Sequence, residues 1–219
     1  MTEIHELLDL SKTIAAGLFE GKTYPWETLV EIKEYILALG KTLSAEEFDH
    51  PEEGVWIAKD AKIFPSAYIG APCIIDHEAE VRHCAFIRGS AIVGKGAVVG
   101  NSTELKNVVL FDKVQVPHYN YVGDSILGYR AHMGAGSITS NVKSDKSLVI
   151  VKEAGREIET GRKKVGAILG DRVEVGCNSV LNPGTVIGRD SQIYPVSCVR
   201  GVIPPNSIYK DKDHVVTKR

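Results

Sequence analysis

Two cationic side chains of this chain stand 18 residues apart, each directly after an aliphatic residue. Arg88 follows Ile87, and Lys106 follows Leu105. In a chain that repeats its path with that period, the two cations lie one above the other, and at about 5 Å they repel by about 1 kcal/mol in water. A phosphate between them would reverse this repulsion and accept hydrogen bonds from both. The spacing therefore indicates either an anion site or a pair of solvated corner charges.

The segment from Pro117 to Asp124 holds a second candidate for chemistry, His118. Histidine titrates near neutral pH, so its imidazole can take a proton from an attacking amine or hydroxyl. Tyr121 is placed to orient a ligand, and Asp124 is placed to steady the imidazole. The chain has seven histidines, and a histidine in a repeat is more often a surface residue than a base. Spacing alone leaves both interpretations of His118 open.

A zinc site is a further alternative wherever histidines fall in a repeat. It would need three histidines on neighbouring turns and an open fourth position. His77 and His83 lie six residues apart, on different faces, and His118 and His132 lie 14 apart. The four cysteines are scattered without CxxC spacing, which is typical of reduced thiols rather than of metal ligands. We therefore predict no metal.

These candidates lie on a repeat of six residues. From Ile57 to Leu105 every sixth residue is aliphatic, and the residue four positions later is almost always small. A period of six fits neither an amphipathic helix nor an alternating strand. It is typical of a hexapeptide β-helix, in which three flat faces close a turn of about 18 residues and the turns stack about 4.8 Å apart. We predict an all-β fold, a parallel β-helix, that holds Arg88 and Lys106 at one corner.

A helical segment is expected before this repeat. Residues 2–20 have the apolar stripe of an amphipathic helix, and a second helix begins after a cap at Thr23. A solenoid needs its open end covered, so we expect residues 1–54 to form a helical cap and its connector. The aromatic residues Tyr24 and Trp26 have an alternative role as part of a substrate wall.

The β-helix itself is expected over residues 55–205. One step shortens to five residues between Val122 and Met133, and irregular places in a regular array often carry function. At about 142–167 the period is lost, which predicts a loop or hairpin inserted into the β-helix. The last residues, 206–219, form a polar tail.

Composition excludes several classes of partner. The chain has 26 basic and 28 acidic residues, which argues against nucleic acid or a membrane surface as the main partner. No apolar run is long enough to span a bilayer, and the N-terminus lacks the order of a signal peptide. We expect a cytoplasmic protein.

Several segments of the predicted β-helix are similar to one family of transferases. The runs Arg88–Gly89, Glu104–Lys106, His118–Asp124 and Gly134–Asn141 resemble the acetyltransferase half of glucosamine-1-phosphate acetyltransferase/N-acetylglucosamine-1-phosphate uridyltransferase. The run Thr160–Asp171 is similar to archaeal sugar-1-phosphate nucleotidylyltransferases that carry the same transferase half. The resemblance implies a left-handed β-helix, a homotrimer with its sites in the clefts between subunits, and acetyl-CoA as the donor.

The resemblance also implies catalytic and cofactor-binding roles. His118 would be the base that takes a proton from the sugar amine, and the backbone N–H of Ala135 would stabilise the oxyanion formed on the thioester. Coenzyme A would contact Ala135 and Cys177. The basic residues Arg162 and Lys164 could meet its phosphates at a subunit edge, although a basic loop tip is usually just solvated.

The acceptor-binding residues implied by the resemblance are Arg88 and Lys106 for the phosphate, and Tyr121, His132, Asn141 and Lys146 around the sugar. Three positions depart from the family. His132 stands where an asparagine is expected near the acceptor amine, and Val142 replaces an aromatic residue. Ser147 replaces a lysine, for which Lys146 is close enough to substitute.

We predict an acetyl-CoA-dependent N-acetyltransferase that acts on an amino-sugar 1-phosphate similar to glucosamine-1-phosphate. Residues 1–40 contain no Gly-rich nucleotide loop, so we expect no nucleotidyltransferase activity. The departures at His132, Val142 and Ser147 leave open a non-catalytic trimeric protein that binds a sugar phosphate. A third hypothesis is that the protein transfers an acyl group to a nucleotide sugar.

Overall fold

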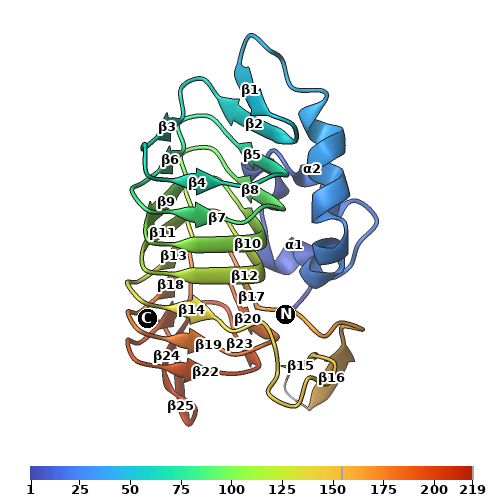
Figure 1. Cartoon of the computed structure of the whole chain (residues 1–219). Helices are drawn as coiled ribbons and strands as arrows, with labels where there is room; N and C mark the ends of the chain where they lie inside the picture. The colour runs from blue at the N-terminus through green and yellow to red at the C-terminus, as the bar shows by residue number, and fades with distance from the viewer. Residues whose placement is uncertain (154, 219) are drawn as a thin grey trace.

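The computed structural model describes residues 1–153 and 155–218, and the hexad repeat forms a β-solenoid of about nine turns (Figure 1). Strands of successive turns pair in parallel, with Ile57 opposite Ile75 and Ile75 opposite Val93. From Ile75 onward the predicted inward residues are fully buried, while Ile57 lies near the open end and is only partly buried. The predicted parallel β-helix is confirmed.

Three faces make up each turn. One face, named the covered face, contains β2 (Val55–Ala58), β5 (Cys73–Ile75), β8 (Ala91–Val93), the second half of β10 (Glu104–Leu110) and of β12 (Tyr121–Leu127), β17 (Ala167–Leu169), β20 (Thr185–Ile187) and β23 (Val202–Ile203). The open face contains β4 (Tyr68–Ile69), β7 (Phe86–Ile87), the first half of β10 and β12, β14 (Ile138–Thr139), β19 (Val180–Leu181) and β22 (Cys198–Val199).

The remaining face, named the polar face, presents mostly polar side chains. Its strands are β3 (Lys62–Ile63), β6 (Glu80–Val81), β9 (Val98–Asn101), β11 (Gln115–His118), β13 (His132–Met133), β18 (Glu174–Val175), β21 (Gln192–Ile193) and β24 (Ser207–Asp211). An antiparallel strand, β25 (His214–Thr217), closes this face at the C-terminal end. At the other end β1 (Phe48–Glu52) pairs antiparallel with β2 and covers the first turn.

Two turns of the solenoid are one residue shorter than the rest. Val93 pairs with Leu110, and Leu110 pairs with Leu127, at a spacing of 17 residues rather than 18. The sequence located only the second of the two shortened steps. In these turns β10 and β12 run from the open face to the covered face as single strands, and left-handed φ angles of 56° at Asn107 and 47° at Asp124 make the corner.

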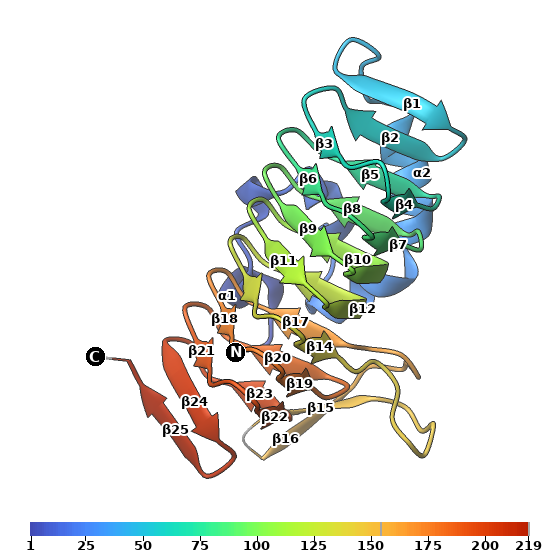
Figure 2. The same ribbon diagram turned by 60° about the vertical axis from the view of Figure 1, so that its left-hand side comes forward.

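The predicted insertion is visible in the pairing register. Leu127 pairs with Leu169, so 42 residues separate these neighbours instead of about 18. Part of the added chain forms an antiparallel hairpin of β15 (Ile150–Glu153) and β16 (Arg156–Glu159), and Figure 2 shows this hairpin beside the lower turns.

The N-terminal segment is less regular than predicted. It contains α1 (Ile4–Leu7), the short 3₁₀ helices η1 (Leu10–Lys12), η2 (Ala16–Phe19) and η3 (Pro25–Val30), and α2 (Ile32–Gly40). The continuous helix over residues 2–20 is therefore wrong. Polar side chains bond the local backbone instead, since Asp9 accepts from Ser11 N–H at 3.0 Å and Thr13 from Ala15 N–H at 3.1 Å. Thr23 does not cap the second segment, because η3 begins after Tyr24.

The N-terminal segment lies along the covered face, not over the open end of the solenoid (Figures 1 and 2). The reason is a column of apolar side chains that point outward from this face and are buried beneath the segment or the hairpin, namely Trp56, Ile74, Ile92, Val109, Ile126, Ile168 and Val186. Burying this column is favourable by about 25 cal/mol per Å². The expectation of an end cap is thus corrected. Trp26 is buried in the core, so it does not form an accessible substrate wall.

Buried polar contacts fix the segment to the turns. The carboxylate of Asp171 accepts hydrogen bonds from the backbone N–H groups of Asp9 and Tyr129, both at 2.9 Å. Its own backbone N–H donates to Leu7 O at 3.0 Å. On the other side of the face, Asn107 Nδ2 donates to Leu29 O at 3.0 Å. The segment is held at both edges of the face that it covers.

Candidate active site

The corner between the open and covered faces, named the cation corner, carries Arg88 and Lys106 on neighbouring turns. Their preceding residues Ile87 and Leu105 pair directly, which confirms the predicted stacking. Each cation, however, has its own carboxylate. Arg88 Nη1 lies 2.8 Å from Glu104 Oε1, and Lys106 Nζ lies 3.0 Å from Asp124 Oδ1. The repulsion argument for a bound anion is therefore wrong, because the chain itself neutralises both charges.

Asp124 is the centre of the polar network at the cation corner. Its carboxylate is only 2% exposed and accepts from Lys106 Nζ at 3.0 and 3.2 Å, from Asn107 Nδ2 at 2.9 Å and from Asn141 Nδ2 at 2.6 Å. These bonds turn it toward the covered face. The expectation that Asp124 steadies the imidazole of His118 is wrong.

Three predicted acceptor residues meet in this network. Asn141 Nδ2 also donates to the phenolic oxygen of Tyr121 at 3.2 Å, and both residues border the Lys106–Asp124 pair. Burial, together with the charge of Asp124, raises the pKa of Tyr121 above its ordinary value. The phenol therefore stays protonated at neutral pH. Its oxygen accepts a hydrogen bond from Asn141, and in the described part of the chain its O–H has no acceptor, so it can donate to a ligand.

The corner between the polar and open faces, named the histidine corner, carries the other predicted chemistry. His118 ends β11 and is exposed, and Gly136 N–H donates to its carbonyl at 3.0 Å, so Ala135 lies one turn below it. Asn178 N–H donates to Ala135 O at 2.8 Å, which places Cys177 one turn further on. Among the described residues the Ala135 N–H has no acceptor. It can donate to an oxyanion beside His118.

A cavity of about 310 Å³ opens below this corner. Its lining is mostly apolar or backbone and includes Gly134, Cys177, Tyr194 and Pro195. A narrow groove of this kind suits an extended, largely apolar arm of a ligand. The cavity therefore suits an extended ligand that passes beside Gly134 and Cys177.

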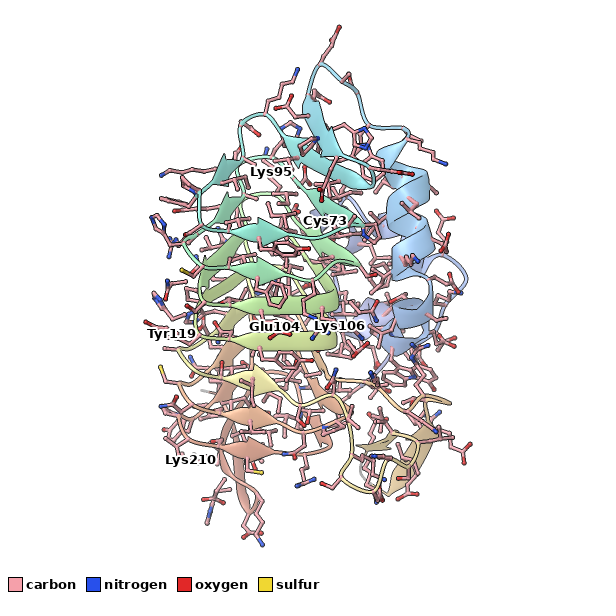
Figure 3. The ribbon with its side chains drawn as sticks, in the orientation of Figure 1. Cys73, Lys95, Glu104, Lys106, Tyr119 and Lys210 are labelled. Carbon is pink, nitrogen blue, oxygen red and sulfur yellow. The ribbon has the colours of Figure 1, made fainter. Side chains whose placement is uncertain are left out.

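The two corners lie at opposite ends of the open face. Figure 3 shows Tyr119, the neighbour of His118, at one end of a turn and Lys106 at the other, with Glu104 between them. The structure therefore brings the predicted residues together in two groups, not one. His118, Ala135 and Cys177 form the first group, while Arg88, Lys106, Tyr121 and Asn141 form the second.

Four predicted residues belong to neither expected group. His132 sits on the polar face, where its Nδ1 is 2.7 Å from Glu174 Oε2; it lines the cavity beside Cys177 and does not join Asn141. Lys146 lies in an exposed turn of the insertion, with a φ of 56°. Arg162 and Lys164 line a groove at the cation corner and not the cavity beside Cys177.

A comparison of the sequence with family models decides which family the chain falls into. The model described as the GMPPB C-terminal domain matches residues 69–187, more than half of the chain. The chain belongs to this family. As a GMPPB C-terminal domain it is a hexapeptide-repeat domain related to the acetyltransferase parts of the GlmU proteins and of the archaeal bifunctional enzymes.

Two curated relatives illustrate the relation. The bifunctional protein GlmU of Methanococcus maripaludis is 36% identical over 136 residues, which cover 62% of this chain and 33% of that protein. The bifunctional sugar-1-phosphate nucleotidylyltransferase/acetyltransferase of Sulfurisphaera tokodaii is 29% identical over 192 residues, covering 85% of this chain and 47% of that protein. The chain spans between a third and a half of the length of these relatives.

A solved structure overlaps the domain loosely. The acetyltransferase domain of PglB from Neisseria gonorrhoeae, in complex with acetyl coenzyme A, is 15% identical with a TM-score of 0.31 and covers 75% of this chain and 57% of that one.

Within the described residues no helix is long and apolar enough to cross a membrane. No group of three or more His, Cys, Asp or Glu side chains in those residues could hold a metal ion.

For this GMPPB C-terminal domain, sequence reasoning missed Asn107 and Glu104 and gave Asp124 the wrong partner. The 18-residue spacing would have placed Asp124 directly on Lys106, but this turn is one residue shorter, and Gly123 is the residue that pairs with Lys106. The direction of a corner side chain depends on the local φ, which spacing does not reveal.

Proposed function

We propose that this chain is an acetyl-CoA-dependent N-acetyltransferase acting on an amino-sugar 1-phosphate. The main support is the open face itself, which carries His118 at one end and the Lys106, Tyr121 and Asn141 cluster at the other. The curated relatives add support, because their names include an acetyltransferase or the bifunctional GlmU protein.

In the proposed reaction the amine of the sugar attacks the carbonyl carbon of the thioester. His118 accepts the proton that the amine loses, and the Ala135 N–H hydrogen-bonds the oxygen that gains negative charge. The C–S bond then breaks, and the thiolate of coenzyme A takes the proton back from the imidazolium. At the far end of the face, Lys106 has a donor left for the sugar phosphate while Tyr121 and Asn141 orient the ring.

We further propose that the chain acts as a homotrimer whose open faces meet. The observation behind this is a pair of exposed aromatic side chains on that face, Tyr68 and Phe86, with ring centroids 5.4 Å apart. Exposed aromatic patches of this kind mark protein interfaces. A neighbouring chain on the open face would form the second wall of a cleft beside His118.

We place the reaction in the cytoplasm. Three cysteines, Cys84, Cys177 and Cys198, are free and exposed, and exposed thiols persist in a reducing compartment.

The test is a thiol-release assay with acetyl-CoA and a panel of amino-sugar 1-phosphates that includes the glucosamine and galactosamine compounds. We expect coenzyme A with a free thiol to be released when acetyl-CoA and at least one of these sugar phosphates are both present. Absence of turnover on every amino-sugar phosphate would contradict the proposal. If calorimetry then showed sugar-phosphate binding without turnover, the chain would be a binding protein. A second panel of nucleotide sugars identifies the case in which the acceptor carries a nucleotide.

A further inference from the structure

A groove of about 590 Å³ lies at the cation corner, between the N-terminal segment and the end of the insertion. Its floor is formed by Lys106, Asn107 and Asp124 of the polar network at the cation corner. Leu29 and Val30 of η3 form one wall, and the residues from 161 to 164 that follow β16 form the other. The groove is therefore built by three segments that are distant in the sequence.

The charge of this groove is unbalanced. Asp124 is its one carboxylate, and it is already occupied by Lys106. Arg162, Lys163 and Lys164 form no ion pair with any carboxylate in the described part of the chain. Three adjacent cations on one wall repel one another, and an anion in the groove would relieve that repulsion.

Arg162 is held in a fixed place in the wall of the groove. Its Nε is shut off from solvent and has no hydrogen-bond partner within residues 1–153 and 155–218. A buried donor without an acceptor is costly in a folded protein. The backbone around it is fixed, since Val149 N–H donates to Arg162 O at 2.7 Å and Arg162 N–H donates to Thr160 Oγ1 at 3.2 Å. These bonds hold the residue in the wall of the groove, where an anion would offset the charge of its guanidinium group.

The opposite wall is also held in place. The Asn107 amide donates both to Leu29 O at 3.0 Å and to Asp124 Oδ1 at 2.9 Å, so it links η3 to the floor of the groove. Val30 stands beside it with 62% of its surface exposed, and its side chain limits the width of the groove.

We propose that this groove binds a phosphoryl group of the acceptor, with Arg162 and Lys164 as its ligands beside Lys106. The basic residues that follow β16 then serve the acceptor and not coenzyme A, and the N-terminal segment is a wall of the acceptor site. The identity of the ligand as acceptor rests on the proposed function, whereas anion binding by the groove does not.

The direct test is calorimetric titration of inorganic phosphate and of pyrophosphate into the full chain. We expect Arg162→Gln and Lys164→Gln each to weaken pyrophosphate binding about tenfold, because each removes one charged hydrogen bond. Val30→Trp should weaken it as well by filling the groove, without disturbing the core. The matched control is Lys152→Gln, a cation of the same hairpin that lies outside the groove and pairs with Glu157 at 2.9 Å.

The inference would be overturned if Arg162→Gln and Lys164→Gln both bound pyrophosphate as tightly as the wild type does. It would also be overturned if the wild-type chain bound neither phosphate nor pyrophosphate. Tighter binding of pyrophosphate than of phosphate assigns a diphosphate acceptor, and equal binding assigns a phosphate monoester. In the transfer assay the groove variants should raise the acceptor KM and leave kcat unchanged. If the groove variants lose anion binding but the wild-type chain transfers acetyl to no acceptor, the proposed function is wrong and the groove assignment stands. If the groove variants transfer acetyl with an unchanged acceptor KM, the groove assignment is wrong and the proposed function stands.

Discussion

At the scale of single residues, the site depends on which direction a corner side chain takes. Asp124 lies within β12, where this strand passes from the open face to the covered face, and its left-handed φ of 47° turns the carboxylate toward Lys106, Asn107 and Asn141. Removing one partner of the Lys106–Asp124 pair costs more than breaking a surface ion pair, because it leaves a charge in this buried corner without a partner. The exposed pair of Arg88 and Glu104, one turn away, has no such environment.

These two pairs give a matched prediction for stability. Asp124→Asn removes the charge opposite Lys106 and leaves a partly buried ammonium group, so we expect the free energy of unfolding to fall by about 3 kcal/mol. Glu104→Gln breaks a solvent-exposed pair and should cost about 1 kcal/mol or less. Urea unfolding of both variants at neutral pH measures the difference. Equal losses would mean that Asp124 does not organise the corner.

The proposed base gives a kinetic prediction at the same scale. His118→Ala should lower kcat about 10²- to 10⁴-fold with little change in the acceptor KM, because the imidazole moves a proton without holding the sugar. His83 is a suitable control, since it lies at the same corner two turns away and bonds Ser66 Oγ at 3.2 Å. His83→Ala should keep the wild-type rate. Full activity in His118→Ala would show that another group takes the proton.

At the scale of elements, the covered face determines where the N-terminal segment lies. Its strands are apolar on both sides, as in Cys73-Ile74-Ile75, because Cys73 and Ile75 point into the coil while Ile74 points outward beneath the helices. Such apolar runs recur on most turns of this face, with Ser125 and Thr185 as the polar exceptions, and are typical of strands buried on both sides. The sequence therefore contained the signal that this face is covered, although the hexad analysis considered only the inward residues.

A pH dependence is expected where the segment joins the turns. Asp112, whose N–H donates to Lys12 O at 3.0 Å, has a carboxyl pKa raised above 3.8, mainly by burial and further by the charge of Asp76. The folded state thus holds this proton more tightly than the unfolded state, and stability falls as pH rises from about 3.8 through the folded-state pKa. Asp112→Asn removes the carboxyl whose deprotonation lowers stability, and its amide oxygen can still accept from Lys95 N–H. Relative to wild type, its melting temperature should improve between about pH 3.5 and about pH 7.

The control for this titration has the opposite sign. Hydrogen bonds from Arg172, at 2.6 and 2.8 Å, lower the pKa of Asp190, so its stabilising charge is present above 3.8 and is lost as the pH falls through the lowered pKa. Asp190→Asn should therefore lose stability relative to wild type as the pH rises. Parallel melting curves for Asp112→Asn and the wild type would contradict the assignment of Asp112.

At the scale of the whole molecule, periodicity predicted the architecture and the stacking of Arg88 and Lys106. A fixed six-residue repeat has few geometrically acceptable folds, which is why that prediction held. Periodicity also implied that His118 and Lys106 occupy different corners, because the 12 residues between them make up two of the three faces of a turn, but the family resemblance assigned both residues to one site. The N-terminal breaks at Asp9 and Thr13 were hidden, since local side-chain bonds outcompete helix propensity there.

The separation of the two corners makes assembly the decisive property of the molecule. If the open face pairs with a second and third copy, its aromatic residues are interface residues, and Phe86→Arg should disrupt the trimer because it places a charge in an apolar contact. In the isolated chain the Phe86 side chain is 43% exposed, so an arginine there can extend into solvent and folding should survive. Val216→Arg is the matched control, because Val216 and Phe86 are both 43% exposed, but Val216 lies on β25 of the polar face.

Sedimentation equilibrium measures the outcome. We expect the wild type and Val216→Arg to sediment as trimers and Phe86→Arg as a smaller species with the same circular dichroism spectrum. Acetyl transfer should be lost together with the trimer, because His118 would then lack the second wall of its cleft. A wild-type monomer that is fully active would show that the open face works alone, and in that case the acceptor has to reach from the cation corner to His118 on a single chain.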